Sequence, residues 1–180
     1  MSGLAVKLIT ICLIAAALNC LANPAAKKSK RKNAMFSVSV RPTAGRPVLD
    51  GRLSKNEWVN AATIQNFTQK EPVEGESVSE PTVVLITYDE ENIYFGIRCF
   101  DKDAQKIVAT EMRRDYDLTE NDYFEIIIDT YHDQRNAYYF ATNSLGARLD
   151  CEVKADGKHI NWEWDGIWSS KAQKDSLGWT

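Results

Sequence analysis

Two pairs of short segments with strand periodicity, each joined by a turn of hairpin length, most constrain the fold of this 180-residue chain. Thr82–Tyr88 and Ile93–Phe100 are rich in β-branched and aromatic residues and are separated by four polar residues. Ala137–Thr142 and Ala147–Val153 flank a second turn, which contains Gly146. Several short strands with regular turn signals predict an all-β fold, an antiparallel β-sandwich of the immunoglobulin-like or jelly-roll-like type.

Other segments refine this prediction. Tyr123–Thr130 contains three successive isoleucines, which predicts a strand covered on both faces near the middle of a sheet. In Ala147–Val153 apolar and charged residues alternate, so Arg148, Asp150 and Glu152 share one face. Weaker patterns predict strands at Phe36–Val40, Ile107–Met112 and Trp168–Ala172.

One short N-terminal helix is predicted to begin at Ser54 and to close at Ala61 and Ala62. Ser54 and Glu57 have the spacing of a capping box, and Leu53 and Trp58 have the spacing of a hydrophobic staple. Trp58 is therefore expected to be structural.

The N-terminus has the pattern of a removable export signal. Met1–Lys7 is positively charged and Leu8–Leu18 is apolar, about half the roughly 20 residues that span a bilayer. Small residues at positions 20 and 22 predict cleavage after Ala22. The domains are therefore a signal peptide at 1–22, a basic linker at 23–35 and a β-sandwich at 36–180, which is expected to be truncated at its C-terminal end. The exported chain is expected in the periplasm, at the outer membrane or outside the cell; lipidation at Cys20 and a retained anchor stay open as alternatives.

Charge argues against nucleic acid as a partner. Six of the 22 Lys and Arg residues precede residue 33, which leaves 16 basic against 25 acidic side chains in the rest of the chain. Phosphate binding requires clustered cations on the folded surface.

Most specific catalytic motifs are absent from the sequence: no Gly-rich phosphate loop, serine-nucleophile elbow or His-Glu-x-x-His occurs. Glu125 and Asp129 would lie roughly 13 Å apart along a strand, beyond the separation that glycosidases use. Catalytic residues are therefore not assigned. Cys99 and Cys151 remain in the exported chain, either bridged or as buried thiols.

The strongest chemical signal is the segment from Trp162 to Trp168, with Trp164 between them. If it is extended, Trp162 and Trp164 share a face and form an aromatic platform flanked by polar side chains. Indole stacks on the axial C–H groups of pyranose rings, while amides and carboxylates bind the hydroxyls. The alternative is that the tryptophans cap the sandwich core.

A second polar group of residues is Arg113, Arg114 and Asp115, with Asp122 following. We expect at least one of the two arginines to form a bidentate contact with Asp115 or Asp122 near the tryptophans, because a buried guanidinium needs a partner. Each arginine is either a brace of this kind or a contact for sugar hydroxyls.

The order of these motifs resembles family 9 carbohydrate-binding modules, a branch of the DOMON-like β-sandwiches. It is most similar to the variant at the start of large exported bacterial proteins, which continue into a region resembling an outer-membrane barrel. The resemblance covers residues 37–180. It is carried by Val48-Leu49-Asp50-Gly51-Arg52-Leu53, Glu57-Trp58, Ala61, Glu71-Pro72, Glu74-Gly75, Pro81-Thr82, Tyr88-Asp89, Ile93-Tyr94, Arg113-Arg114-Asp115, Asp122, Phe124, Asp129, Asn143, Gly146 and Trp164-Asp165-Gly166-Ile167-Trp168.

The resemblance implies binding of a poly- or oligosaccharide in a polysaccharide-degrading system. It implies sugar stacking on Trp162, Trp164 and Trp168, polar contacts from Arg113, Arg114, Asp115 and Asp122, and, as in some members, a structural calcium ion. A downstream barrel or hydrolase domain is the expected partner, because the family pattern normally continues past Thr180. Two alternatives stay open: part of a hydrolase acting on O-glycosyl bonds, and a non-catalytic structural domain of an outer-membrane protein. Haem is disfavoured, because no Met and His pair occupies convincing strand positions.

Overall fold

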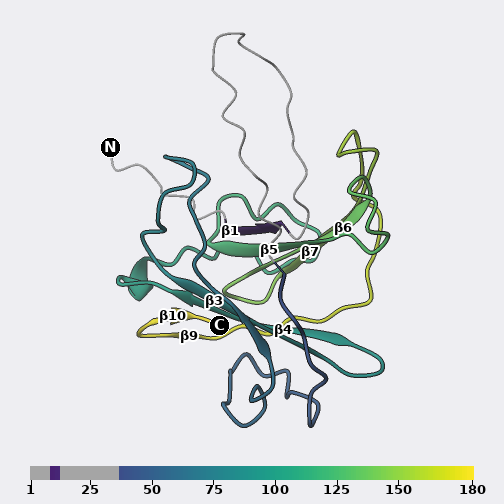
Figure 1. Ribbon diagram of the computed structural model, residues 1–180. Coiled ribbons are helices and arrows are strands. Elements are labelled where there is room, and N and C mark those ends of the chain that lie inside the picture. The colour runs from purple at the N-terminus through teal and green to yellow at the C-terminus, as the bar shows by residue number, and fades with distance from the viewer. Residues whose placement is uncertain (1–8, 13–36) are drawn as a thin grey trace, which may run out of the picture.

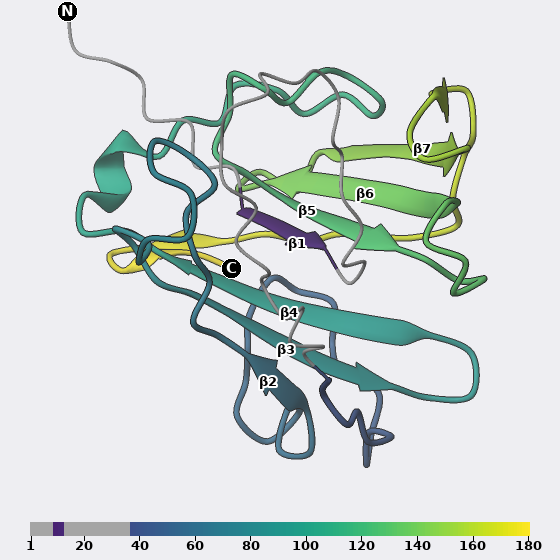
Figure 2. The same cartoon turned by 45° about the horizontal axis from the view of Figure 1, so that its top comes forward.

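The computed structural model describes residues 9–12 and 37–180, which form two five-stranded sheets packed face to face (Figures 1 and 2). The first sheet has the order β1-β5-β6-β7-β8, with β1 at Ile9–Cys12, β5 at Tyr123–Ile128, β6 at Ala137–Asn143, β7 at Arg148–Lys154 and β8 at His159–Asn161. The second has the order β2-β3-β4-β10-β9, with β2 at Ala62–Ile64, β3 at Thr82–Tyr88, β4 at Ile93–Phe100, β10 at Gly178–Trp179 and β9 at Lys174–Asp175. Neighbouring strands are antiparallel except β1 and β5, which run parallel. The predicted all-β antiparallel sandwich is confirmed.

The core between the sheets is built from the strands with the strongest β-branched and aromatic patterns. Val84 and Cys99 of the second sheet pack against Phe124 and Ile126 of β5, and Trp179 of β10 joins them. Tyr123 to Ile126 of β5 are buried, whereas Ile127 and Ile128 are half-buried, so the predicted burial on both faces holds for the first part of the strand. β5 is the second strand of its sheet, between β1 and β6.

A second apolar cluster covers the opposite face of the first sheet. Leu118, from the loop before β5, packs with Tyr123, Ala141, Ala147 and Leu149. The first sheet is therefore buried on both faces in its central part, one face by the second sheet and the other by this loop.

The predicted helix at Ser54 is wrong. Residues 54–60 form turns, with Glu57 N–H donating to Ser54 C=O at 3.0 Å, and Ala62 already belongs to β2. A helix this short gains few hydrogen bonds for the cost of nucleation, so tertiary contacts decide its backbone. Leu53 and Trp58 pack over Gly96 of β4, where an added Cβ would lie 2.8 Å and 2.9 Å from their side chains. Trp58 is structural, as expected.

The three weaker strand predictions also fail in the residues described. Residues 37–40, 107–112 and 168–172 contain no strand; one helical turn, η1 at Ala104–Lys106, lies between β4 and β5. No helix in the described ranges has the length and apolar character to cross a membrane. The predicted signal peptide and linker lie outside the described residues, except for β1.

Candidate functional site

Asp150 of β7 organises the surroundings of the tryptophans. It is 0% exposed, and its carboxylate accepts hydrogen bonds from the Gly166 N–H at 2.6 Å, the Trp168 indole N–H at 2.9 Å and Arg114 Nη2 at 3.1 Å. In register it lies opposite Phe140 of β6, which pairs on its other side with Ile126 of the core. The face of β7 that carries the charged residues is therefore covered at this point by residues 162–168, called here the Trp-rich segment.

Arg114 connects the loop before β5 to the Trp-rich segment. Its guanidinium contacts Asp115 at 3.1 Å, Asp150 at 3.1 Å and Asp165 at 2.8 Å, and it donates to the Gly166 carbonyl at 3.3 Å. Burial disfavours the charged guanidinium, but the three carboxylates outweigh it and raise the Arg114 pKa. Arg114 is thus a brace that holds the segment against the sheet.

Arg113 points to a different partner. Its Nε and Nη2 atoms bind both oxygens of Glu111, at 2.9 Å and 2.6 Å, and its guanidinium lies 3.7 Å from the centre of the Tyr116 ring. The side-chain hydrogen bond from Arg113 is the main cause that lowers the pKa of Glu111 to about 2.

The sequence predicted a bidentate contact from one of these arginines to Asp115 or Asp122. The bidentate pair that forms joins Arg113 to Glu111 instead, so the predicted partner is wrong. Arg114 binds Asp115 through one nitrogen, and Asp122 instead accepts the Val108 N–H at 2.7 Å. The reason is local: residues 113–122 form no strand, so strand alternation does not direct their side chains.

The three tryptophans occupy different environments. Trp164 stacks on Tyr138, with ring centres 4.6 Å apart, whereas Trp162 meets Tyr139 edge-on at 6.2 Å. Tyr138 and Tyr139 are successive residues of β6 and point to opposite faces of the sheet. The predicted common platform of Trp162 and Trp164 does not form, because β8 ends at Asn161 and a turn follows.

Trp168 is anchored at its polar end and its ring. Its indole N–H is bound to Asp150, its ring packs edge-on against Phe140 at 5.4 Å, and its backbone carbonyl accepts a hydrogen bond from Arg148 at 2.5 Å. Trp168 therefore matches the core-capping alternative. Trp162 is 53% exposed and offers more accessible aromatic surface than the half-buried Trp168.

An aromatic ridge that sequence reasoning missed lies beside Trp164. It consists of Tyr131, Tyr138 and Trp164: Trp164 stacks on Tyr138, and the neighbouring Tyr131 side chain raises the pKa of Tyr138. Tyr131 is 69% exposed. Glu152 lies opposite Tyr138 in register and is paired with Lys154 at 2.9 Å. The sequence signal for this ridge is the position of Tyr131 and Tyr138 at the two ends of the loop between β5 and β6. The two ends of a hairpin loop lie close together.

The carboxylates considered for catalysis are engaged within the fold. The Tyr139 hydroxyl donates to Glu125 Oε2 at 2.9 Å, and burial, with the nearby Glu125 charge, strongly raises the pKa of Tyr139. Asp129 accepts backbone N–H groups of the following turn, from Tyr131 at 3.1 Å and Gln134 at 2.8 Å.

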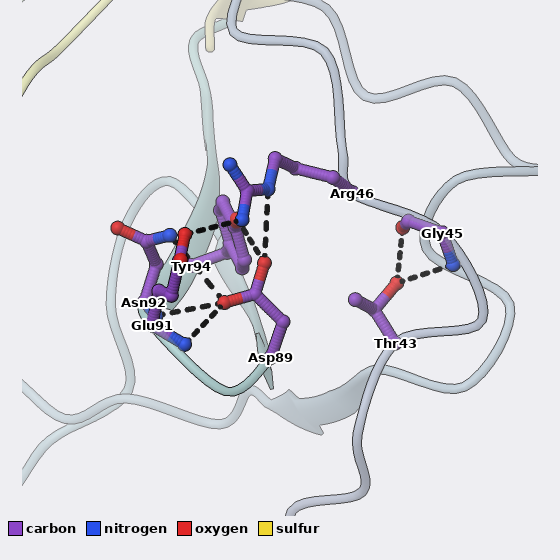
Figure 3. A network of polar contacts seen from close by, with 7 residues as sticks. All are labelled: Thr43, Gly45, Arg46, Asp89, Glu91, Asn92 and Tyr94. Carbon is purple, nitrogen blue, oxygen red and sulfur yellow. Dashed lines mark hydrogen bonds and ion pairs between the residues drawn. The ribbon is translucent and has the colours of Figure 1, made fainter.

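A separate polar network braces the hairpin between β3 and β4 (Figure 3). Arg46 contacts Asp89 at 3.0 Å and Glu91 at 2.8 Å, and the Tyr94 hydroxyl donates to Asp89 at 2.6 Å. The Tyr94 hydrogen bond, followed by the backbone N–H of Glu91, lowers the pKa of Asp89. Arg46 also lines a depression of about 210 Å³ formed with residues 44–45, 56–57 and 59–60.

The described ranges contain no group of three or more His, Cys, Asp and Glu side chains placed to hold a metal ion. Cys99 and Cys151 are buried thiols in different sheets and form no disulfide with each other. Burial, with the Asp150 charge, raises the pKa of Cys151 to about 11.

Comparisons of the chain with family models, with curated proteins and with solved structures find no match in any of the three. The chemistry of the aromatic ridge and of the Trp-rich segment is therefore the ground on which a function is proposed.

Proposed function

We propose that this chain is an exported carbohydrate-binding module, akin to family 9 modules, that serves polysaccharide breakdown beside a hydrolase or an outer-membrane partner. The observation that carries the proposal is the aromatic ridge. The stacked rings of Tyr138 and Trp164, with the Tyr131 side chain near Tyr138, stand beside the charged pair of Glu152 and Lys154 on a braced sheet. Aromatic rings stack on the C–H faces of sugars, and a carboxylate and an ammonium group bind hydroxyls at their edge.

The contacts within the site divide its residues into two roles. Tyr131, Tyr138 and Trp164 are the proposed stacking residues, with Glu152 and Lys154 at the hydroxyls. The Trp-rich segment is held in place by three contacts. Arg114, which also contacts Asp115, binds Asp165 of the segment and Asp150 of β7. The Trp168 indole donates to Asp150. Arg113 and Asp122 are engaged by Glu111 and Val108, so they support the loop before β5.

The partner class follows from the same chemistry. Such a ridge fits neutral or weakly charged sugar units, which present both an apolar face and a rim of hydroxyls. The net negative charge of residues 33–180 disfavours polyanionic glycans, as it disfavours nucleic acid.

The test is a glycan array followed by calorimetric titration of the best ligand. Tyr131→Ala and Trp164→Ala should each weaken binding roughly 2- to 10-fold or more, the worth of one aromatic contact at about 0.5–1.5 kcal/mol. Tyr88→Ala is the matched control, because Tyr88 is an exposed tyrosine at the end of β3 in the other sheet.

Two results would contradict the proposal. One is the absence of saturable binding to any plant, algal or microbial glycan. The other is binding that Tyr131→Ala, Trp164→Ala and Trp162→Ala all leave unchanged while the variants stay folded. Loss of binding in Trp162→Ala alone would move the site to the opposite face of the sheet.

A further inference from the structure

The edge strand of the first sheet comes from a segment that export would remove. β1 runs parallel to β5, with Ile9 opposite Phe124 and Cys12 opposite Ile127 (Figure 2). All of β1 lies within residues 1–22, the predicted signal peptide. Cleavage after Ala22 would therefore detach β1 and make β5 the edge of the sheet.

β5 lacks the features that protect natural sheet edges. Such edges usually carry several charges, a proline or a bulge. β5 has the sequence Tyr-Phe-Glu-Ile-Ile-Ile, and its first four residues are buried. Its one charged side chain, Glu125, accepts a hydrogen bond from Tyr139 of the neighbouring strand. Every second residue of β5 directs its N–H and C=O groups away from β6, and these groups require another partner.

We propose that the β5 edge of the exported chain is a strand-acceptor site. Its occupant is an extended, uncharged segment of a partner protein, rich in β-branched residues, that adds to the sheet parallel to β5. The parallel direction and the uncharged character follow from the segment that β5 pairs with in this structure, Ile-Thr-Ile-Cys at residues 9–12. The inference rests on the proposed export, because only removal of β1 opens the edge.

Such binding has a defined physical basis. Strand addition derives affinity from main-chain hydrogen bonds, and specificity from the side chains that alternate along the added strand. An attached β1 competes at an effective concentration in the millimolar range, so the uncleaved chain keeps its own edge closed.

The test uses a fluorescent peptide of residues 7–14, with lysines appended for solubility, and measures its anisotropy under reducing conditions. The chain 23–180 should bind the peptide saturably. The full chain carrying both Thr10→Pro and Ile11→Pro should bind it as well, because proline removes backbone donors from β1. The unaltered full chain should bind the peptide at least roughly tenfold more weakly, because β1 already occupies its edge.

Two N-methylated peptides are the matched controls, one methylated at Thr10 and the other at Ile11. In a parallel ladder, alternate residues direct their N–H groups to a given neighbour, so one of the two peptides should lose binding and the other should keep it. Hydrophobic adsorption would treat both peptides alike, and that result would overturn the proposal.

Hydrogen exchange gives a second readout that does not depend on the folding of the shorter chain. In the full chain, amides of Phe124–Ile127 that face β1 should exchange roughly tenfold faster after the two proline substitutions. Unchanged exchange would overturn the assignment of β1 as the edge strand of β5.

A second copy of the chain is the competing occupant. If the chain 23–180 is a dimer that the peptide does not dissociate, the edge pairs with itself and the partner-segment proposal is wrong. Glycan titration of the same samples is an independent measurement, so a failure of the acceptor site and a failure of carbohydrate binding are distinguishable.

Discussion

Replacing Arg114 by methionine should destabilise the fold, whereas the same change at its neighbour Arg113 should have little effect. Methionine keeps much of the side-chain volume and removes the charge. Arg114 is 33% exposed and contacts Asp150, which is 0% exposed, so its loss leaves a buried carboxylate with only the neutral donors Gly166 and Trp168. Breaking a fully buried pair costs about 3–5 kcal/mol and an exposed pair contributes about 0–1 kcal/mol. The partial exposure of Arg114 places its cost between these limits, at about 1.5–3 kcal/mol.

Arg113 provides the matched control. Its side chain is 67% exposed and its partner Glu111 lies in the same loop, so Arg113→Met should cost about 1 kcal/mol or less. Urea unfolding, monitored by tryptophan fluorescence, gives the free energy of unfolding of both variants. Asp150→Ala should show the largest loss and so sets the upper bound, because Asp150 anchors Arg114, Gly166 and Trp168. Equal losses in the two arginine variants, or a larger loss for Arg113→Met, would refute the assignment of Arg114 as the brace.

Three further outcomes are expected. Gly166→Ala should lower the free energy of unfolding by about 1–3 kcal/mol, because the added Cβ would lie 2.9 Å from an indole carbon of the Trp-rich segment. Gly45→Ala is the control: its Cβ would have nothing within 4 Å, so urea unfolding should show almost no loss beyond the backbone effect. Because the pKa of Glu111 is lowered from 4.5 to about 2, its contribution to stability is present above pH 4.5 and is lost as the pH falls toward about 2. The urea midpoint of Glu111→Gln should therefore fall less between about pH 5 and pH 3 than that of the unaltered chain. Cys99 and Cys151 should react with a thiol reagent only on unfolding, and the melting temperature should be the same with and without reductant, since both thiols are buried; a reductant-dependent melting temperature would contradict this.

The two hairpins, β3 with β4 and β6 with β7, and the strand β5 could be predicted because their signals are local. The period of two in Thr82–Tyr88 and Ala147–Val153 depends on neighbouring residues alone, and the turns between strands are marked by polar residues and Gly146. The three isoleucines of Tyr123–Thr130 predicted burial on both faces; Ile126 is buried, and Ile127 and Ile128 are half-buried. The basic tract before residue 33 and the acidic balance after it also needed no structure.

The short helix shows where local signals lose to tertiary contacts. Ser54 and Glu57 have the spacing of a cap, and their backbone does form one turn. The packing of Leu53 and Trp58 over Gly96, and the pairing of β2 with β3, then decide the path of the chain.

The candidate site depended on tertiary structure for its main assignments. The sequence identified the Trp-rich segment and the two arginines as the region of interest, but both lie in irregular stretches where no repeating backbone directs the side chains. Arg114, in the loop before β5, reaches Asp150 of β7, 36 positions later in the chain, and the same buried carboxylate binds the Trp168 indole. The turn after β8 separates Trp162 from Trp164, and Trp164 stacks on Tyr138 of β6. Periodicity therefore identified the long strands β3 to β7, whereas contacts between distant parts of the chain determined the short strands and which side chains meet. The physical reason is that a contact across a sheet depends on register rather than on neighbours in sequence.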